Sequence, residues 1–210
     1  DWSAALTRKA FSQNYFLSLA GGSKSTKVLF SMNFKDQKGI IVSSGSQTLT
    51  GRLKIDHSVT KWLKLGINTN YYIQNRDKTS VDVSGTSTTA VTNLNPLMKL
   101  TDIWNTLSDA GATGGYIYNS PYYIVHNVTN DASKNRLTLT PYIEFTLAKG
   151  LKLKSQFSYI NTISESFYYS PSFMPKADRL KTGGTAKRST ATNRNLNSET
   201  TLSFNRTIKK

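Results

Sequence analysis

The side chains in this chain that could carry out acid–base, nucleophilic or metal chemistry are few and scattered. The 210 residues include 2 histidines, 12 aspartates and glutamates together, and no cysteine. His57 and His126 have no companions at metal-ligand spacing, and the glycine-rich stretch 111–115 lacks the lysine of a phosphate-binding loop. No serine lies in a nucleophile-elbow pattern, and the carboxylates are not paired for glycoside hydrolysis. We expect no catalytic, cofactor-binding or metal-binding residue and no enzyme activity.

One group of side chains has the chemistry of a binding site. Aromatic rings can stack on sugars or on peptide side chains, and a neighbouring asparagine supplies hydrogen bonds. Such residues gather in the longest stretch without strand patterning: Trp104, Tyr116, Tyr118, Asn119, Tyr122 and Tyr123. They are candidates for ligand contact, and the alternative is that they pack this segment on itself. Leucines spaced as in a helix follow Pro96, which predicts a short helix within 94–107.

A second group consists of basic residues at alternating positions of the expected strands. Its members are Arg52, Lys54, Lys64, Arg136, Lys152 and Lys154. If this side of the strands faces an aqueous lumen, these residues bias the lumen towards anionic groups or pair with acidic residues of a plug inside it. The alternative is that they only solvate the wall. The net charge of +15 also suggests nucleic-acid binding, but the basic residues are spread thinly and no nucleic-acid motif accompanies them. We expect no nucleic-acid partner.

The elements that carry these residues are β-strands, because apolar and polar residues alternate with period two. Hairpins are expected at about 13–35, 51–73 and 135–160, with a last strand at about 194–208, giving about seven strands of about 9 to 13 residues. The phrase 51–55 matches 135–139, and 62–65 matches 150–153, so the hairpin is an internal repeat. The expected fold class is all-β and antiparallel.

The connections between these strands alternate between short and long. Short ones lie near 21–26, 60–61 and 148–150, and long ones span 36–47, 74–134 and 161–193. This asymmetry is typical of an outer-membrane β-barrel with short periplasmic turns and long extracellular loops. Tyr71, Tyr72, Tyr159, Tyr168 and Tyr169 are expected near the extracellular strand ends, and Trp62 near the other interface.

Two other interpretations stay open. A soluble β-sandwich, such as a carbohydrate-binding or adhesin module, also has alternating strands, although usually shorter ones. A small barrel of eight strands would need an eighth strand within 75–134 or 161–193. Pro141 disfavours both the membrane and the soluble sheet, because it removes a ladder donor from within a strand.

Several phrases, in order, resemble one family. They are residues 1–2, 8–10, 12–22, 24–27, 36–41, 51–56, 62–68, 119–123 and 135–137, which read DW, RKA, SQNYFLSLAGG, KSTK, DQKGII, GRLKID, WLKLGIN, NSPYY and NRL. Their order and spacing resemble the barrel of SusC/RagA-like TonB-dependent outer-membrane transporters. The resemblance covers most of residues 1–160 and weakens beyond them. A terminal aromatic typical of such barrels is not found at Lys210.

The resemblance implies a location and a set of partners. It implies a fragment of a transmembrane barrel of about 22 strands, without the plug domain, in the outer membrane of a Gram-negative, Bacteroidota-like bacterium. Such a transporter imports oligosaccharides or oligopeptides, driven by the TonB complex that contacts the plug, and a SusD-like surface lipoprotein acts as its lid. The partners implied are that lipoprotein, TonB, membrane lipid and the substrate. The aromatic residues between 104 and 123 then contact ligand or lid.

Overall fold

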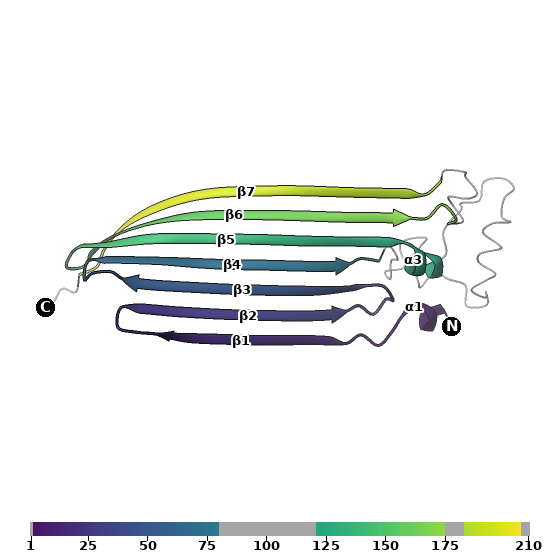
Figure 1. Cartoon of the computed structure of the whole chain (residues 1–210), viewed down its shortest axis with the longest axis horizontal. Helices are drawn as coiled ribbons and strands as arrows, with labels where there is room; N and C mark the ends of the chain where they lie inside the picture. Colours follow the sequence, from purple (N-terminus) through teal and green to yellow (C-terminus); the bar gives the residue numbers. More distant parts are fainter. Residues whose placement is uncertain (1, 80–120, 175–182, 207–210) are drawn as a thin grey trace.

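A computed structural model describes residues 2–79, 121–174 and 183–206. Seven long strands form a single-layer sheet (Figure 1). The strands are β1 (Ser12–Gly22), β2 (Thr26–Lys38), β3 (Gly45–Ser58), β4 (Leu63–Asp77), β5 (Thr129–Ala148), β6 (Leu151–Ser170) and β7 (Thr185–Phe204). Their spatial order is their sequence order, and every neighbouring pair is antiparallel. The expected all-β antiparallel sheet of about seven strands is confirmed.

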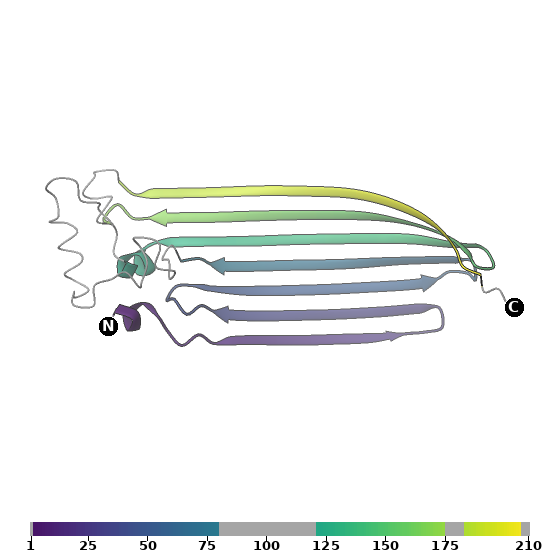
Figure 2. The ribbon, with the colours of Figure 1, turned by 180° about the vertical axis from the view of Figure 1, so that it is seen from behind.

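The sheet is open in the part of the chain that the structure describes, because β1 and β7 pair with one neighbour each. The short turns between β1 and β2, between β3 and β4, and between β5 and β6 all lie at one end of the strands (Figures 1 and 2). We call this the turn end and the opposite end the loop end. In the β5–β6 turn Gly150 has φ 84°, and its amide carbonyl accepts a hydrogen bond from the Asn205 amide at 2.8 Å. Glycine adopts this left-handed conformation without the steric cost that a β-carbon adds.

The strands are longer than the alternation of apolar residues indicates. They range from the 11 residues of β1 to the 20 residues of β5, β6 and β7. β4 pairs with β5 as far as Asp77 and Asp131, well beyond Ile73, where the apolar alternation stops. The last strand covers Thr185–Phe204 and not 194–208. Backbone pairing depends on N–H and C=O groups, which polar residues supply as well as apolar ones, so pairing continues where hydrophobicity ends.

The fully buried side chains lie at the loop end and not within the sheet. Helix α1 (Trp2–Leu6) and helix α3 (Pro121–Asn127) sit there side by side (Figures 1 and 2). The buried apolar residues of the described chain are Leu6, Ile41, Ile124, Val125 and Met174. The Val42 amide donates to the Leu6 carbonyl at 3.0 Å, and the Ser43 hydroxyl donates to the Val125 carbonyl at 2.6 Å. These contacts join the chain's first residues to the segment before β5.

Neither α1 nor α3 was expected from the sequence, because each is too short to show helical periodicity. The helix expected within 94–107 lies outside the described residues. An eighth strand was considered within 75–134 or 161–193, and residues 80–120 and 175–182 of these segments also lie outside the described residues. The strands and the helix in their described parts are those of β4, α3, β5, β6 and β7. Among the helices that the structure describes, none has the length and apolar character needed to span a membrane.

Candidate functional site: the two faces of the sheet

The strand registers sort the side chains onto two faces of opposite character. One row across the sheet joins Phe30, Leu53, Thr69, Leu139, Tyr159 and Leu196. The parallel row two residues nearer the turn end joins Val28, Ile55, Ile67 and Pro141. Cross-strand neighbours in register share a face, so these rows form one continuous apolar surface. We call it the apolar belt: alternate residues within 15–19, 28–34, 49–55, 63–73, 137–145, 151–163 and 196–204.

In the described part of the chain, no other layer covers the side chains of this apolar belt. Phe30, Met32 and Leu65 lie well inside the sheet, yet they are 37%, 40% and 40% exposed. A continuous exposed apolar surface of this kind marks contact with a membrane or with another protein. In β4 the belt runs from Leu63 to Ile73, a distance of ten residue steps, or about 33 Å along the strand.

The belt also shifts steadily from strand to strand. Its midpoint in β1 is Leu17, which is joined through Met32 and Gly51 to Tyr71 of β4. Its midpoint in β7 is Thr200, which is joined through Ser155 and Ile143 to Leu65 of β4. The six residues from Tyr71 to Leu65 are therefore covered in six strand-to-strand steps, about one residue per step.

This shift sets the angle at which a level apolar layer crosses the strands. The belt moves by one residue, about 3.3 Å along the strand, for each strand-to-strand spacing of about 4.8 Å. If the apolar layer is level, these two lengths correspond to strands tilted by about 35° from its normal. Transmembrane barrels tilt their strands by about 35–45° and carry an apolar band about 25 Å tall. Tilting the 33 Å stretch of β4 by about 35° gives a layer about 27 Å tall, so the belt has the tilt and height of a membrane-spanning band.

Aromatic residues lie near both borders of the belt. Trp62 stacks on Phe145 near the turn end, with ring centroids 6.2 Å apart, and Tyr15 stacks on Phe34 towards the loop end at 6.5 Å. The five tyrosines that the sequence grouped near the extracellular ends do not form one row. Tyr71 and Tyr159 lie in adjacent rows of the belt, whereas Tyr169 pairs with Thr129 at the tips of β5 and β6. The strand register places these tyrosines in different rows, and the register cannot be read from the sequence alone.

The opposite face of the sheet is polar and carries all six of the basic residues singled out in the sequence. Arg52, Lys54, Lys64, Arg136, Lys152 and Lys154 alternate with belt residues along β3, β4, β5 and β6. Arg52 donates to the Asn68 side-chain oxygen at 3.2 Å, and Arg136 donates to the Thr162 hydroxyl at 3.2 Å. Their shared placement follows from the period-two alternation, whereas their exposure to a lumen stays a prediction.

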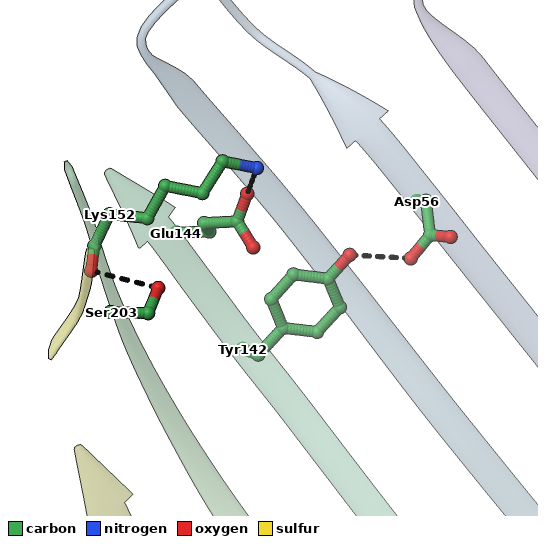
Figure 3. A network of polar contacts seen from close by, with 5 residues as sticks. All are labelled: Asp56, Tyr142, Glu144, Lys152 and Ser203. Carbon is green, nitrogen blue, oxygen red and sulfur yellow. Dashed lines mark hydrogen bonds and ion pairs between the residues drawn. The ribbon is translucent and has the colours of Figure 1, made fainter. Parts of the chain in front are cut away.

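A tyrosine on this polar face spans three strands. Tyr142 of β5 reaches across β4, and its hydroxyl donates to Asp56 of β3 at 2.6 Å (Figure 3). The ring passes over Gly66, which pairs with both Asp56 and Tyr142, and a β-carbon at Gly66 would collide with the ring. Glycine is therefore required by a close approach and not by an unusual backbone conformation.

Charged groups surround this tyrosine. The Lys64 and Lys154 ammonium groups lie 5.8 Å and 4.8 Å from the centroid of the Tyr142 ring, within range of a cation–π attraction. Lys54 pairs with Asp56 at 3.3 Å, and Lys152 pairs with Glu144 at 3.2 Å (Figure 3). The polar face near the turn end is therefore an interlocked set of cations, carboxylates and one aromatic ring that joins β3 to β6.

Replacing Tyr142 by phenylalanine is expected to lower the free energy of unfolding by about 1–2 kcal/mol, because the Asp56 carboxylate loses a hydrogen bond in a partly buried position. Urea titration of the folded protein in lipid vesicles measures the change. Tyr72→Phe is the matched control, since the Tyr72 hydroxyl has no hydrogen-bond partner among the residues that the structure describes. Equal losses in the two variants would show that the Tyr142–Asp56 bond contributes nothing.

The aromatic binding candidates are only partly placed by the structure. Trp104, Tyr116, Tyr118 and Asn119 lie outside the described residues. Tyr122 and Tyr123 belong to α3, and the Tyr122 ring packs at 4.4 Å on the ring of His126, one turn later. His57 lies on the apolar face, where its Nδ1 is 2.8 Å from the Thr26 hydroxyl. Among the described residues, no three His, Asp or Glu side chains gather as metal ligands would.

Sequence reasoning missed three basic residues of the polar face at the loop end. Arg76, Lys78 and Lys134 line a hollow of about 450 Å³ beside β6 and β7. The alternation of apolar and polar residues ends at Ile73 and begins again at Asn135, so the sequence pattern assigns these three residues to loops. Continuing the same period-two count past Ile73 puts Gln74, Arg76 and Lys78 on the polar face, which is the signal that would have found them.

No protein-family model matches the chain. The TonB-dependent receptor P26 of Formosa agariphila is 24% identical over 204 residues, which are 97% of this chain and 20% of that protein. The solved RagAB peptide transporter is similar in fold, with a TM-score of 0.67 and 21% identity over 96% of this chain and 23% of its own. The RagAB peptide importer in its 'closed-closed' state gives a TM-score of 0.63 at 21% identity, covering 100% of this chain and 24% of its own.

This chain spans about a fifth of the curated relative's length. The names of these relatives are those of receptors and transporters, and the sequence similarity and the fold similarity point to the same class of protein. The resemblance seen in the sequence is thus confirmed: this chain is similar, in sequence and in fold, to a section of the barrel of SusC/RagA-like TonB-dependent transporters.

Proposed function

We propose that this chain forms part of the wall of a TonB-dependent outer-membrane transporter that imports oligosaccharides or oligopeptides. The observation that carries the proposal is the apolar belt, an exposed surface on one face of the sheet with the height and tilt of a membrane-spanning band. The similarity to a TonB-dependent receptor and to peptide transporters supports the same conclusion.

In this arrangement the two faces of the sheet do different work. The belt contacts lipid hydrocarbon, where backbone groups need partners within the sheet, and each interior strand supplies them on both sides. The polar face lines the aqueous interior, with Arg52, Lys54, Lys64, Arg136, Lys152 and Lys154 exposed to it. The loop end, with α1 and α3, faces outward.

The proposal includes the partners that such a transporter needs. A SusD-like surface lipoprotein covers the loop end, and energy arrives from TonB through a plug domain. The aromatic set Trp104, Tyr116, Tyr118, Asn119, Tyr122 and Tyr123 contacts the ligand or the lipoprotein lid. The wall itself carries out no chemistry.

Uptake by whole cells tests this function. Cells that express the complete protein together with the proposed SusD-like lipoprotein should accumulate labelled oligosaccharides or oligopeptides. Deletion of tonB should abolish this uptake. A second measurement tests whether the chain folds in a membrane. If it does, the chain should acquire β-structure in phospholipid vesicles or detergent. A monodisperse monomer with native β-structure in plain buffer would contradict the proposal and favour the soluble carbohydrate-binding or adhesin module.

A further inference from the structure

The polar face has two zones that differ in charge balance. Near the turn end its carboxylates are Asp56 and Glu144, which pair with Lys54 and Lys152, and Glu199, which accepts a hydrogen bond from Gln156. Towards the loop end the described strands carry no acidic residue on this face, beginning with the row of Arg52 and Asn70. Cations continue there, and three of them gather in the hollow of about 450 Å³ on β4 to β7. We call it the cationic hollow. Its lining includes Arg76, Lys78, Lys134, Ser164, Ser166 and Ser189, together with the acidic residue Glu165.

The acidic residues at this height lie on the opposite face of the sheet. Asp77 follows Arg76 in sequence, so its side chain points to the other side of β4, where it lies opposite Asp131 of β5. Glu165 lies on that side too, paired with Arg188 of β7 at 3.9 Å. Strand register therefore directs Asp77 and Asp131 away from the cations of the hollow, and Glu165, although it contributes to the lining, pairs with Arg188 instead. No ion pair between described residues includes Arg76, Lys78 or Lys134.

Among the residues that the structure describes, these three cations have no carboxylate ion-pair partner, so they attract an anionic group. They repel one another less strongly when an anionic group lies between them, and a hollow lined by one sign of charge concentrates counter-ions. The serine hydroxyls of β6 and β7 add neutral donors and acceptors beside the cations. Among the described residues, no aromatic or large apolar side chain that would bind a peptide side chain lines the hollow.

The rows of the polar face next to the hollow, on its turn-end side, also carry neutral polar groups. On the polar face of β6 and β7 they carry Thr162, Ser158, Asn193, Asn195 and Asn197, which are hydroxyl and amide groups suited to sugar hydroxyls. The combination of a localised positive charge with a hydroxyl- and amide-lined wall points to one ligand class. It is an oligosaccharide that carries carboxylate or sulfate groups.

We infer that the cationic hollow is a binding site for the acidic groups of an anionic oligosaccharide on the polar face of this wall. The inference rests on the proposed transport function and narrows its substrate class. Arg76 provides a planar fork for a carboxylate or sulfate, and Lys78 and Lys134, which line the same hollow, provide flexible ammonium groups.

The experiment uses the complete protein in lipid nanodiscs and measures ligand binding by calorimetry. The probes are tetragalacturonate, a sulfated galactan tetrasaccharide, the neutral cellotetraose and the peptide tetraglutamate. The test variant replaces Arg76, Lys78 and Lys134 by glutamine. The matched control replaces Lys24, Lys61 and Lys149 of the three short turns by glutamine, with the same change in charge at the opposite end of the strands.

The expected result is that one or both acidic saccharides bind more tightly than cellotetraose and that added NaCl weakens them. The test variant should lose about tenfold in affinity for them, because three partly screened charge contacts are removed. The control should change less than twofold. Preference for tetragalacturonate or for the sulfated galactan identifies which acidic group the hollow takes.

Three results would overturn the inference. They are equal binding of cellotetraose and both acidic saccharides, tighter binding of tetraglutamate, or a test variant that binds as the unmodified protein does. A protein that binds none of the four probes overturns it as well. If the test variant fails to fold, the salt dependence and the acidic-over-neutral preference of the unmodified protein decide alone. The proposed transport function fails separately, if TonB-dependent uptake is absent while binding persists.

Discussion

Replacing Gly66 by alanine is expected to lower the free energy of unfolding by about 1–3 kcal/mol, although alanine is normally better than glycine in a strand. The added β-carbon meets the ring of Tyr142, which must then leave its position over β4. The ring would lose its hydrogen bond to Asp56 and its place between Lys64 and Lys154. Urea titration of the complete protein in phospholipid vesicles measures the effect.

Gly51 offers a control of the same chemistry. It lies in β3 on the apolar face, and a β-carbon there meets nothing within 4 Å. Gly51→Ala should therefore be neutral or stabilising by up to about 0.5–1 kcal/mol. Adding Tyr142→Ala to Gly66→Ala should recover part of the loss that the collision causes. If both glycine variants behave alike, the close approach of the ring has no energetic consequence.

Introducing lysine at Ile67 should cost about 2–4 kcal/mol in a bilayer, because the position lies one residue from the middle of the belt in β4. Thr140 of β5 lies at the same level on the polar face, and its side chain makes no hydrogen bond among the residues that the structure describes, so Thr140→Lys should change stability by less than about 0.5 kcal/mol. Equilibrium unfolding of the complete protein from lipid vesicles compares the two.

Depth within the belt provides the further control. Ile73 lies at the loop-end border of the belt, where lysine should cost only about 0–1 kcal/mol. A lipid-facing belt thus gives a large loss at residue 67 and a small one at residue 73. Equal losses at the two positions would indicate a face packed against protein and would contradict the membrane assignment.

The sequence was sufficient to predict the strands and their two faces, because the pattern that encodes them is local. Residues such as Leu53, Ile55 and Lys54 reveal period two within a few positions, and the turns are short enough to fix which strands are neighbours. The six basic residues of the polar face share one side for the same reason.

The strand ends and the cross-strand contacts were not predictable in this way. Arg76 and Lys134 look like loop residues because nothing apolar accompanies them, although the backbone ladder continues through both. The contact between Tyr142 and Asp56 joins residues 86 positions apart and depends on register, on Gly66 between them and on the length of a tyrosine side chain. The aromatic candidates Trp104, Tyr116, Tyr118 and Asn119 lie outside the described residues and remain a prediction.

The strictly sequential order of the seven strands has a consequence for how such a wall is assembled. Each strand finds its ladder partner in the segment that precedes it, so no strand has to wait for a distant part of the chain. The loop to be closed is short at every turn-end hairpin, which keeps the entropic cost of each addition small. The strand added last then provides the backbone groups with which the next strand pairs. A wall of this kind can therefore enter a membrane by extending its free edge one hairpin at a time.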